Sequence, residues 1–481
     1  MVIDPGSGAA RQGAGRGAAA REDASGDWLV PRAPGPVHAI VRLPGSKSMT
    51  NRALILAALS DGPTEITAPL IARDTQLMVS ALQALGCRVE ESSGSWRVEP
   101  ARLGQAGRSG AIRPTIDIDV GNAGTVLRFV PPLAALTDAD VTFRGDARVA
   151  QRPVGPLLAA LRELGAEISD DGTGAVPFTV HGRGALPGGT VTLDASSSSQ
   201  LVSGLLLAAP RFDAGAQIRH HGPPVPSAPH IEMTIRMLRA SGAEVTTSAA
   251  AAVPGPAGRA SAAAPGAEPD VSDTWQVSPG TISAGRIDIE PDLSNAVPFL
   301  AAALATGGEV TVQDWPADSL QPAGQIIGLL RSMGAQVAHT PDGLRVTGPG
   351  QIRGVGADLS EVGELTPVLT ALAALAGSPS EFSGIGHLRR HESDRLAALA
   401  SELGKLGGDV TELPDGLRIR PSPLHARGVV FDSHDDHRLV MAAAVIGLVT
   451  EGLTVRNAAT VGKTFPGFSQ VWAQILTSAA R

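Results

Sequence analysis

The segment LPGSKSMTNR at residues 43–52 leads directly into ALILAAL at residues 53–59, an apolar run of strong helix formers. This order predicts a helix that begins near Ser48, with Lys47 and Arg52 in or beside its first turn. Backbone NH groups without partners and the positive end of the helix dipole meet at such a terminus, so it attracts anions. Only three of the 39 basic residues are lysines, and one stands here. The segment therefore predicts a site for a small, multiply anionic ligand.

Two other interpretations of this segment explain less of it. A plain cap in front of a buried helix accounts for the serines but not for a lysine and an arginine. A phosphate-binding P-loop needs lysine directly after glycine, whereas Ser46 separates Gly45 from Lys47 here. In addition, Ile40 stands where that motif needs its first glycine.

Length, composition and charge limit the class of protein. The 481 residues, 43% of them hydrophobic, suggest two or more domains. A net charge of −8 argues against general binding to nucleic acids or acidic membranes, and no apolar run reaches the roughly 18 residues of a membrane span. The one cysteine, Cys87, permits no intrachain disulfide, fits a reducing cytoplasm, and is expected to pack in the interior. Residues 1–26 lack the apolar region of a signal peptide and are predicted to be a disordered tail.

One pattern of helix and strand recurs six times along the chain. Each copy begins with polar residues and continues as an Ala- and Leu-rich helix. The copies start near Ser48, Gly124, Ser199, Ser294, Glu364 and Asp436. Four of the intervals between these starts span 70 to 76 residues, and the third spans 95. The long interval contains residues 248–269, rich in Ala, Pro and Gly, which we predict to be a flexible insertion.

A second marker falls between these helices, where a further helix ends at a glycine and a strand follows. Glycine supplies the left-handed backbone that terminates a helix. The glycines are Gly86, Gly165, Gly242, Gly334 and Gly407. Each unit therefore contains two helices and several strands, and six such units suit two domains of three units. The Ala-rich helices are only weakly amphipathic, so we expect them to be buried inside each domain with sheets around them.

The six helix starts carry the polar residues that we expect to form a site. They are Lys47, Ser48 and Arg52; Asn122, Gly124, Thr125 and Arg128; Ser198, Ser199 and Gln200; Asp292, Ser294 and Asn295; Glu364; and Asp436, His437 and Arg438. Helix capping explains the Ser, Asn and Asp residues. It does not explain basic residues in a first turn, because a cation there opposes the helix dipole. If symmetry directs these starts toward one cleft, that cleft attracts anions.

Seven motifs in order give the chain a resemblance to a known family. They are PGSKS with NR (residues 44–48 and 51–52), GNAGT with Arg128 (121–125), QRP (151–153), SSSQ (197–200), ESDRL (392–396), DDHR (435–438) and KTFP (463–466). From about residue 37 to the C-terminus, the chain resembles the 5-enolpyruvylshikimate-3-phosphate synthase family of enolpyruvyl transferases. One motif could be chance, but seven in sequence could not reasonably be.

The resemblance implies a fold that agrees with the six repeats. This fold is a two-domain, inside-out α/β barrel of six βαβαββ units with buried helices, three units to a domain. It implies an N-terminal domain at residues 45–288 and a C-terminal domain made of residues 27–44 and 289–481. The chain would cross between the domains near residues 43–45 and 289–292, and substrates would close the cleft.

The resemblance also implies a reaction and a set of site residues. Members transfer the enolpyruvyl group of phosphoenolpyruvate to the 5-hydroxyl of shikimate 3-phosphate through a tetrahedral ketal and release phosphate. By motif, the residues that hold shikimate 3-phosphate would be Lys47, Ser48, Arg52, Ser198, Ser199, Gln200, Ser227, Glu364 and His391. Those that hold phosphoenolpyruvate would be Lys47, Gly124, Arg152, Gln200, Arg395, Arg438 and Lys463. We expect Glu364 to act as the base and Glu392, assisted by Lys47, as the acid.

This chain departs from the family pattern at several of these positions. Many members have lysine where His391 stands, so the charge at this position would vary with pH. Many have aspartate where Glu364 stands, and a tyrosine often appears where Pro229 and His230 follow Ser227. Gly124 is retained, which predicts competition by glyphosate, a phosphonate mimic of phosphoenolpyruvate.

The implied cofactor and partner set is small. We expect no cofactor, because the clusters around His391 and His437 lack a second metal-ligand set at a suitable spacing. The partners would be the two substrates, without nucleic acid or membrane, and we expect a cytoplasmic monomer of the shikimate pathway to chorismate and aromatic amino acids. Two alternatives stay open: a transferase acting on UDP-N-acetylglucosamine, and a catalytically silent anion-binding protein of the same fold.

Overall fold

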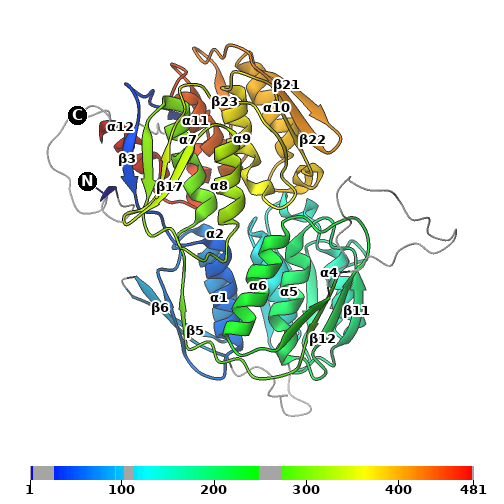
Figure 1. Ribbon diagram of the computed structural model, residues 1–481. Coiled ribbons are helices and arrows are strands. Elements are labelled where there is room, and N and C mark those ends of the chain that lie inside the picture. Colours follow the sequence, from blue (N-terminus) through cyan, green and yellow to red (C-terminus); the bar gives the residue numbers. More distant parts are fainter. Residues whose placement is uncertain (1, 4–25, 93, 102–112, 249–272, 479–481) are drawn as a thin grey trace, which may run out of the picture.

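Two lobes stacked end to end make up the molecule (Figure 1). The computed structural model describes residues 2–3, 26–92, 94–101, 113–248 and 273–478. The N-terminal lobe has one hydrophobic core, formed by residues between Met49 and Ile289. The C-terminal lobe has another, formed by residues from Ile3 to Leu43 and from Leu293 to Leu476. No helix in the described ranges is both long and apolar enough to cross a membrane.

Three sheets surround the core of the N-terminal lobe. Their strands, in spatial order, are β15 (Arg286–Asp288), β4 (Thr64–Thr67), β6 (Ser95–Glu99) and β5 (Arg88–Ser92); β7 (Thr115–Asp119), β8 (Asp140–Arg144), β10 (Phe178–His181) and β9 (Glu167–Ser169); and β11 (Gly189–Leu193), β12 (Ala216–His220), β14 (Thr274–Val277) and β13 (Val245–Ser248). In each sheet the first two strands are parallel and the remaining pairs are antiparallel. Each repeat found in the sequence therefore corresponds to one sheet with this strand order.

The C-terminal lobe repeats the arrangement in two of its sheets, one of them extended by a fifth strand, while its third sheet has three strands in the described residues. Its strands are β1 (Val2–Ile3), β3 (His38–Val41), β16 (Glu309–Val312), β18 (Gly343–Thr347) and β17 (Gln336–Thr340); β19 (Gly356–Asp358), β20 (Ser380–Ser383), β22 (Gly416–Arg420) and β21 (Asp409–Leu413); and β2 (Trp28–Leu29), β24 (Thr454–Arg456) and β23 (Val430–Asp432). The last sheet is completed by β2, which comes from far upstream and pairs antiparallel with β24. The sixth unit therefore borrows a strand from near the N-terminus.

Two residues in the predicted disordered tail, residues 1–26, form a strand. Val2 and Ile3 form β1, which pairs parallel with β3 at the edge of its sheet. For these two residues the prediction is wrong, because the backbone of β3 offers an open edge on which they complete hydrogen bonds and Ile3 is buried. Residues 4–25 lie outside the described part of the chain. The predicted insertion at 248–269 also lies outside it, except for Ser248, which ends β13.

The six repeated helices begin where the sequence predicts and lie inside the lobes. They are α1 (Lys47–Leu59), α3 (Gly124–Ala134), α5 (Ser199–Ala208), α7 (Leu293–Thr306), α9 (Thr366–Ala374, after the 3-10 turn η4, Gly363–Leu365) and α11 (His437–Gly447). Every residue of α3 and of α11 is buried, so neither helix needs a polar face.

The second helix of each unit ends at the predicted glycine. These helices are α2 (Arg73–Ala84), α4 (Gly155–Glu163), α6 (Ala228–Ala240), α8 (Ala323–Ser332) and α10 (Arg395–Lys405). All five glycines that follow have positive φ, between 87° and 106°. The remaining helix, α12 (Phe468–Ser478), packs on the C-terminal core through Phe468 and Trp472.

The chain crosses between the lobes twice, and the two crossings are bonded to each other. Strand β3 precedes α1 yet pairs with β16, while β15 precedes α7 yet pairs with β4. The NH of Ser46 donates to the carbonyl of Glu290 at 2.8 Å, and the NH of Asp292 donates to that of Pro44 at 2.9 Å. Gly45 lies between them, where a Cβ atom would stand 2.2 Å from the carbonyl oxygen of Ala68. Glycine is therefore required for the close approach.

Candidate active site

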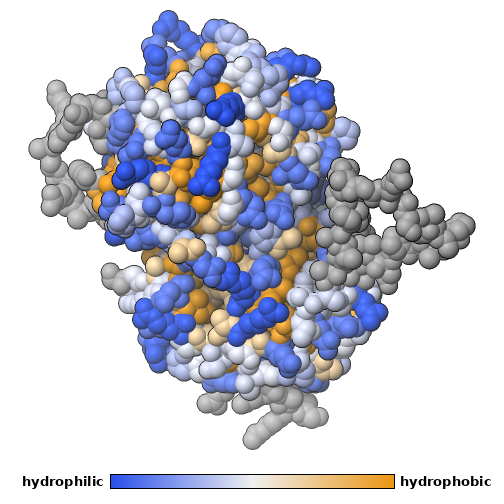
Figure 2. Space-filling view, in the orientation of Figure 1, coloured by the Kyte–Doolittle hydropathy of each residue, from blue (hydrophilic) through white to orange (hydrophobic). Residues whose placement is uncertain are grey.

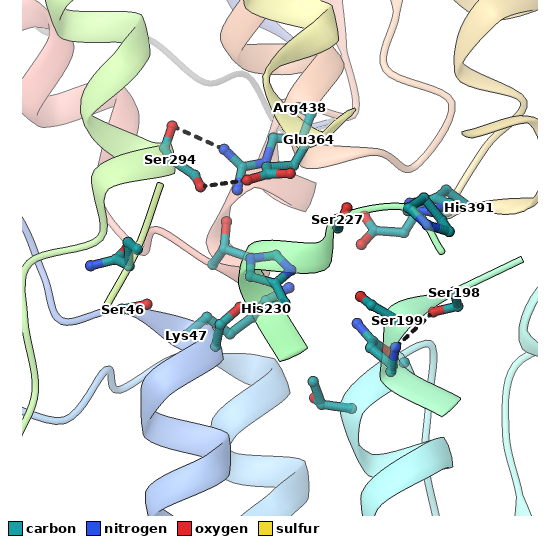
Figure 3. Close-up of a pocket in the computed structure, with 18 of the residues that line it drawn as sticks. Ser46, Lys47, Ser198, Ser199, Ser227, His230, Ser294, Glu364, His391 and Arg438 are labelled. Carbon is teal, nitrogen blue, oxygen red and sulfur yellow. Dashed lines mark hydrogen bonds between the residues drawn. The ribbon is translucent and has the colours of Figure 1, made fainter. Parts of the chain in front are cut away.

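A cavity with about 1010 Å³ of empty space lies where the two lobes meet. The surface is indented along this junction (Figure 2). Side chains from both lobes enter the same space, with Lys47 and Ser199 on one side and Glu364 and His391 on the other (Figure 3). Thirteen of the predicted site residues line it: Lys47, Ser48, Gly124, Arg152, Ser198, Ser199, Gln200, Ser227, Glu364, His391, Glu392, Arg395 and Arg438.

Lys47 is the first residue of α1 and stands at the crossing between the lobes. Ser46 caps the helix through its hydroxyl, which accepts from the NH of Met49. The Lys47 Nζ lies 3.3 Å from the Oδ2 of buried Asp74, while the Lys47 NH donates to Asp292 of the other lobe at 3.2 Å. The ammonium group is therefore fixed at the cavity wall by one carboxylate and keeps other donor hydrogens for a ligand.

Gly124, the first residue of α3, makes room for a second cation. A Cβ atom on Gly124 would stand 2.4 Å from Nη2 of Arg152 and 3.0 Å from Nη1 of Arg128. Arg152 is held by the carbonyl oxygen of Asn122, which accepts from its Nη1 at 2.8 Å. Burial lowers the pKa of Arg152, while the nearby carboxylates of Glu392 and Asp74 oppose that shift. A guanidinium of this kind gains from an anionic ligand.

Hydroxyl groups line the part of the cavity next to α5 and α6. Ser198 caps α5, accepting from the NH of Gln200. Ser227 adopts the left-handed conformation with φ 54° just before α6, and its NH donates to the carbonyl of Ser360 across the interface at 2.7 Å. With Ser199, these groups form a set of small donors suited to the oxygens of a phosphate.

Glu364 enters the cavity from the C-terminal lobe within a small polar group. The Ser294 hydroxyl donates to its Oε1 at 3.4 Å, and Nη1 of Arg438 donates to the carbonyl of Ser294 at 3.1 Å (Figure 3). Burial lowers the pKa of Arg438, and Asp292 opposes that shift. The carboxylate of Glu364 thus lies beside a hydroxyl and a cation at the edge of the space open to ligand.

Glu392 is the most constrained carboxylate of the site. Its Oε2 lies 2.8 Å from Nδ1 of His437, and its Oε1 lies 3.1 Å from Nζ of Lys463. Burial acts to raise the pKa of Glu392, yet His437, Lys463 and Lys47 outweigh burial and hold the pKa well below its usual range. Burial lowers the pKa of His437. We therefore expect Glu392 to be a carboxylate in the protein without substrates, hydrogen-bonded to Nδ1 of His437.

Arg395 begins α10 and is oriented by a buried ion pair. Its Nε lies 2.7 Å from Oδ2 of Asp436, which caps α11, and Ser393 donates to the same oxygen at 3.1 Å. Burial acts to lower the pKa of Arg395, but Asp436 and Glu392 together raise it. This pair fixes the starts of α10 and α11 relative to each other, and both helices contribute a cation to the cavity.

The cavity also holds histidines that sequence reasoning did not assign. His230, from α6, and His387, from the 3-10 turn η5 (Gly386–Arg390), line it beside the predicted His391. The rings of His387 and His391 lie 5.5 Å apart. Burial lowers the pKa of all three, that of His387 to about 4. The position of His230, at the start of a second helix, was a usable signal, whereas His387 belongs to no motif.

Two of the residues predicted to bind a substrate, Arg52 and Lys463, do not line the cavity. Arg52 is 1% exposed, and its guanidinium donates to the carbonyls of Ser48 and His230 behind the wall. Burial lowers the pKa of Arg52 to about 9, so it stays protonated at neutral pH. Lys463 lies behind Glu392, where its Nζ also donates to the carbonyl of Asn122 at 3.1 Å. Neither residue lines the cavity in this conformation, and their direct contact with a ligand stays a prediction.

One group of side chains has the spacing of metal ligands. The ligand atoms of Glu392, Asp436 and His437 lie within 4.8 Å of one another. Their oxygens, however, already face cations, because Glu392 pairs with Lys463 and Asp436 pairs with Arg395. A metal ion would have to compete with both pairs, so these residues fit an ion poorly.

Two solved structures share the fold of this chain. The EPSP synthase from Acinetobacter baumannii superposes with a TM-score of 0.72 at 24% identity, covering 93% of this chain and 98% of that one. The enolpyruvyl transferase NikO from Streptomyces tendae gives a TM-score of 0.68 at 17% identity, covering 93% and 97%. The chain therefore shares the fold of these two proteins.

Sequence similarity narrows the assignment. The sequence model of the family described as EPSP synthase (3-phosphoshikimate 1-carboxyvinyltransferase) matches residues 31–472. A 3-phosphoshikimate 1-carboxyvinyltransferase from Mycobacterium ulcerans (strain Agy99) is 47% identical over 457 residues, which cover 93% of this chain and 97% of the relative. The chain belongs to the EPSP synthase family and is a transferase. The predicted resemblance and fold class are thereby confirmed, and the UDP-sugar alternative is not favoured.

Proposed function

We propose that the cavity transfers the enolpyruvyl group of phosphoenolpyruvate to the 5-hydroxyl of shikimate 3-phosphate and releases phosphate. The observation that carries this proposal is the convergence of four cations and two candidate acid–base carboxylates on one cavity. The cations are Lys47, Arg152, Arg395 and Arg438, and the carboxylates are Glu364 and Glu392. The two substrates together carry roughly five to six negative charges, so a closed site needs several cations to bind them.

The two substrates divide the site between them. Shikimate 3-phosphate binds the hydroxyl-rich side together with the start of α1, through Lys47, Ser48, Ser198, Ser199, Gln200, Ser227, Glu364 and His391. Phosphoenolpyruvate binds the cationic side, through Lys47, Gly124, Arg152, Gln200, Arg395 and Arg438. Arg52 and Lys463 act from behind the wall, where a buried charge still contributes to the potential of a poorly hydrated site.

The reaction is an addition followed by an elimination. Glu364 takes the proton of the 5-hydroxyl as its oxygen attacks the enol carbon, and Glu392, assisted by Lys47, protonates the neighbouring methylene to give a tetrahedral ketal. Phosphate then leaves as Glu392 recovers the proton from the new methyl group, and the proton taken by Glu364 leaves with the departing phosphate. The cations stabilise the charges of the ketal and of the departing phosphate.

Glu392 needs a proton that it does not hold in the protein without substrates. His437, Lys463 and Lys47 keep its pKa well below the usual range. Two bound anions would neutralise part of that positive field and raise the pKa of the carboxyl group. The Glu392 carboxylate would therefore take up its proton when the two substrates bind.

The Glu392→Gln variant tests this assignment. Because glutamine neither donates nor recovers the proton, we expect kcat to fall by about 100-fold or more, while calorimetry shows shikimate 3-phosphate binding within a few fold of wild type. Glu381→Gln is the matched control, since Glu381 is a half-exposed partner of Arg418 and should leave both values unchanged. Wild-type turnover in Glu392→Gln would remove Glu392 from the chemistry.

The cellular location and pathway of this activity are proposed from the family and from one side chain. Cys87 is buried and unpaired, and burial raises its pKa, which suits a reducing cytoplasm. We place the reaction in the shikimate pathway to chorismate and aromatic amino acids. Action as a monomer on two small metabolites, without a cofactor, completes the proposal.

A further inference from the structure

Arg148 joins the N-terminal lobe to the backbone of the proposed acid. It immediately precedes the 3-10 turn η2 (Val149–Gln151). Its Nε lies 3.1 Å from the carbonyl oxygen of Glu392 and 3.3 Å from that of His391, and its Nη2 lies 3.2 Å from the latter. Its Nη1 donates to the Oε1 of Gln151 at 2.7 Å, which holds the guanidinium in this direction. One side chain thus bonds two successive carbonyls of the opposite lobe.

The partners of Arg148 show why this contact matters to the site. Within its own lobe, Glu392 is held through its carboxylate by His437 and Lys463. Its carbonyl is held by Arg148 from the other lobe. Separation of the lobes must break the Arg148 bonds, and the backbone of residues 391–392 then loses its outer support. At the same time, Lys463 would lose its hydrogen bond to the carbonyl of Asn122, which belongs to the N-terminal lobe.

Two further contacts between the lobes do not involve the proposed acid. Ser227 bonds Ser360, and Arg236 pairs with Asp318 at 2.9 Å, but neither pair touches a residue proposed to transfer a proton. Arg148 has no ion pair recorded within the described residues, so its charge is directed at the two carbonyls. The planar guanidinium donates to two neighbouring oxygens in a fixed geometry, which the flexible ammonium group of a lysine reproduces only in part.

We propose that Arg148 is a positioning residue that couples closure of the lobes to the placement of Glu392. When the lobes close, the two hydrogen-bonded carbonyls fix residues 391–392 and bring the carboxyl group into line with the methylene of phosphoenolpyruvate. When they open, the acid is left without this support, so the enol is not protonated before both substrates are enclosed. This inference rests on the proposed role of Glu392.

The test compares Arg148→Gln and Arg148→Lys with an arginine outside the junction. Arg144→Gln is the control, because Arg144 is exposed and pairs with Asp117 on the neighbouring strand. We expect Arg148→Gln to lower kcat at least 30-fold while the Kd of shikimate 3-phosphate changes less than 3-fold. Arg148→Lys should recover part of the loss, and Arg144→Gln should match wild type.

A double variant separates positioning from general damage. If Arg148 acts through Glu392, Arg148→Gln combined with Glu392→Gln should be no slower than Glu392→Gln alone. Wild-type kcat in Arg148→Gln, an equal loss of kcat and of shikimate 3-phosphate binding, or a fully additive double variant would each overturn the inference. If Glu392→Gln itself kept wild-type turnover, the proposed function would fail first, and the two failures are thereby distinguished.

Discussion

At the residue scale, the closest packing in the site is between Gly124 and two guanidinium groups. A methyl group on Gly124 would overlap Nη2 of Arg152 at 2.4 Å, so that cation must move. The displaced cation faces the space proposed for phosphoenolpyruvate. Glycine at this position therefore sets the shape of the phosphate-binding side as well as beginning α3.

Gly124→Ala tests this packing. Because Arg152 must shift, we expect the KM for phosphoenolpyruvate to rise by about 10-fold, the equivalent of ~1.4 kcal/mol, and inhibition by glyphosate to weaken as well. Steady-state kinetics against both compounds give the values. Gly328→Ala is the control, since Gly328 lies in α8 with nothing within 4 Å of an added Cβ atom. Equal phosphoenolpyruvate KM values in the two variants would show that Gly124 does not shape the site.

His387 predicts how stability depends on pH. Burial and the nearby Arg395 lower its pKa from 6.5 to about 4, so between these values the unfolded chain binds a proton that the folded chain does not. The folded state is therefore favoured by this group above pH 6.5, and the contribution is lost as the pH falls toward 4. The His387→Gln variant should show a smaller loss of unfolding free energy between pH 7 and pH 5, by about 2 kcal/mol at most. Urea denaturation of both proteins at pH 7 and pH 5 measures this loss. An equal loss of unfolding free energy in wild type and in His387→Gln would refute the prediction.

Motif residues could be predicted from the sequence more reliably than their orientation. Lys47 and Ser48 stand at the helix start and reach the cavity, as expected. Arg52 follows one turn later on the same buried helix, so its side chain turns back into the lobe and meets Thr234 and Phe129. Which way a first-turn residue points depends on packing between α1 and α6, and no local pattern encodes that packing. His387 was missed for a similar reason, because a short 3-10 turn carries no periodic signal.

At the element scale, the repeated helices follow from composition, but one strand does not. Glycines at the helix ends and apolar runs predicted the helices and their order. By contrast, β2 contains two residues and joins β24 from more than 400 positions away. Such a pairing leaves no local periodicity, so no local pattern predicts that the sixth sheet is completed from the N-terminal side. The contribution of β2 to the free energy of unfolding can be measured directly.

Trp28 and Leu29 occupy the two faces of β2. Trp28 is fully buried and its ring meets Phe468 edge-on at 6.2 Å, while Leu29 is 56% exposed. We expect Trp28→Ala to lower the free energy of unfolding by about 3–5 kcal/mol, and Leu29→Ala to change it by less than about 0.5 kcal/mol. Chemical denaturation monitored by circular dichroism gives both values. Equal stabilities would mean that β2 does not support the C-terminal core.

At the scale of the whole molecule, the two crossings exchange strands β3 and β15 between lobes. Each lobe thus contains a strand that leads into a helix of the other, and the crossings are bonded through Ser46 and Asp292. This exchange places Lys47 next to the junction. The cations of the C-terminal lobe approach it only when the lobes meet, so neither lobe alone contains the complete site.

The account's central claim is that this junction transfers enolpyruvyl to shikimate 3-phosphate. The most direct test is release of phosphate when the purified full chain is mixed with phosphoenolpyruvate and one acceptor at a time. We predict release with shikimate 3-phosphate and none with UDP-N-acetylglucosamine. Release with the UDP-sugar alone, or with neither acceptor while shikimate 3-phosphate still binds, would contradict the account.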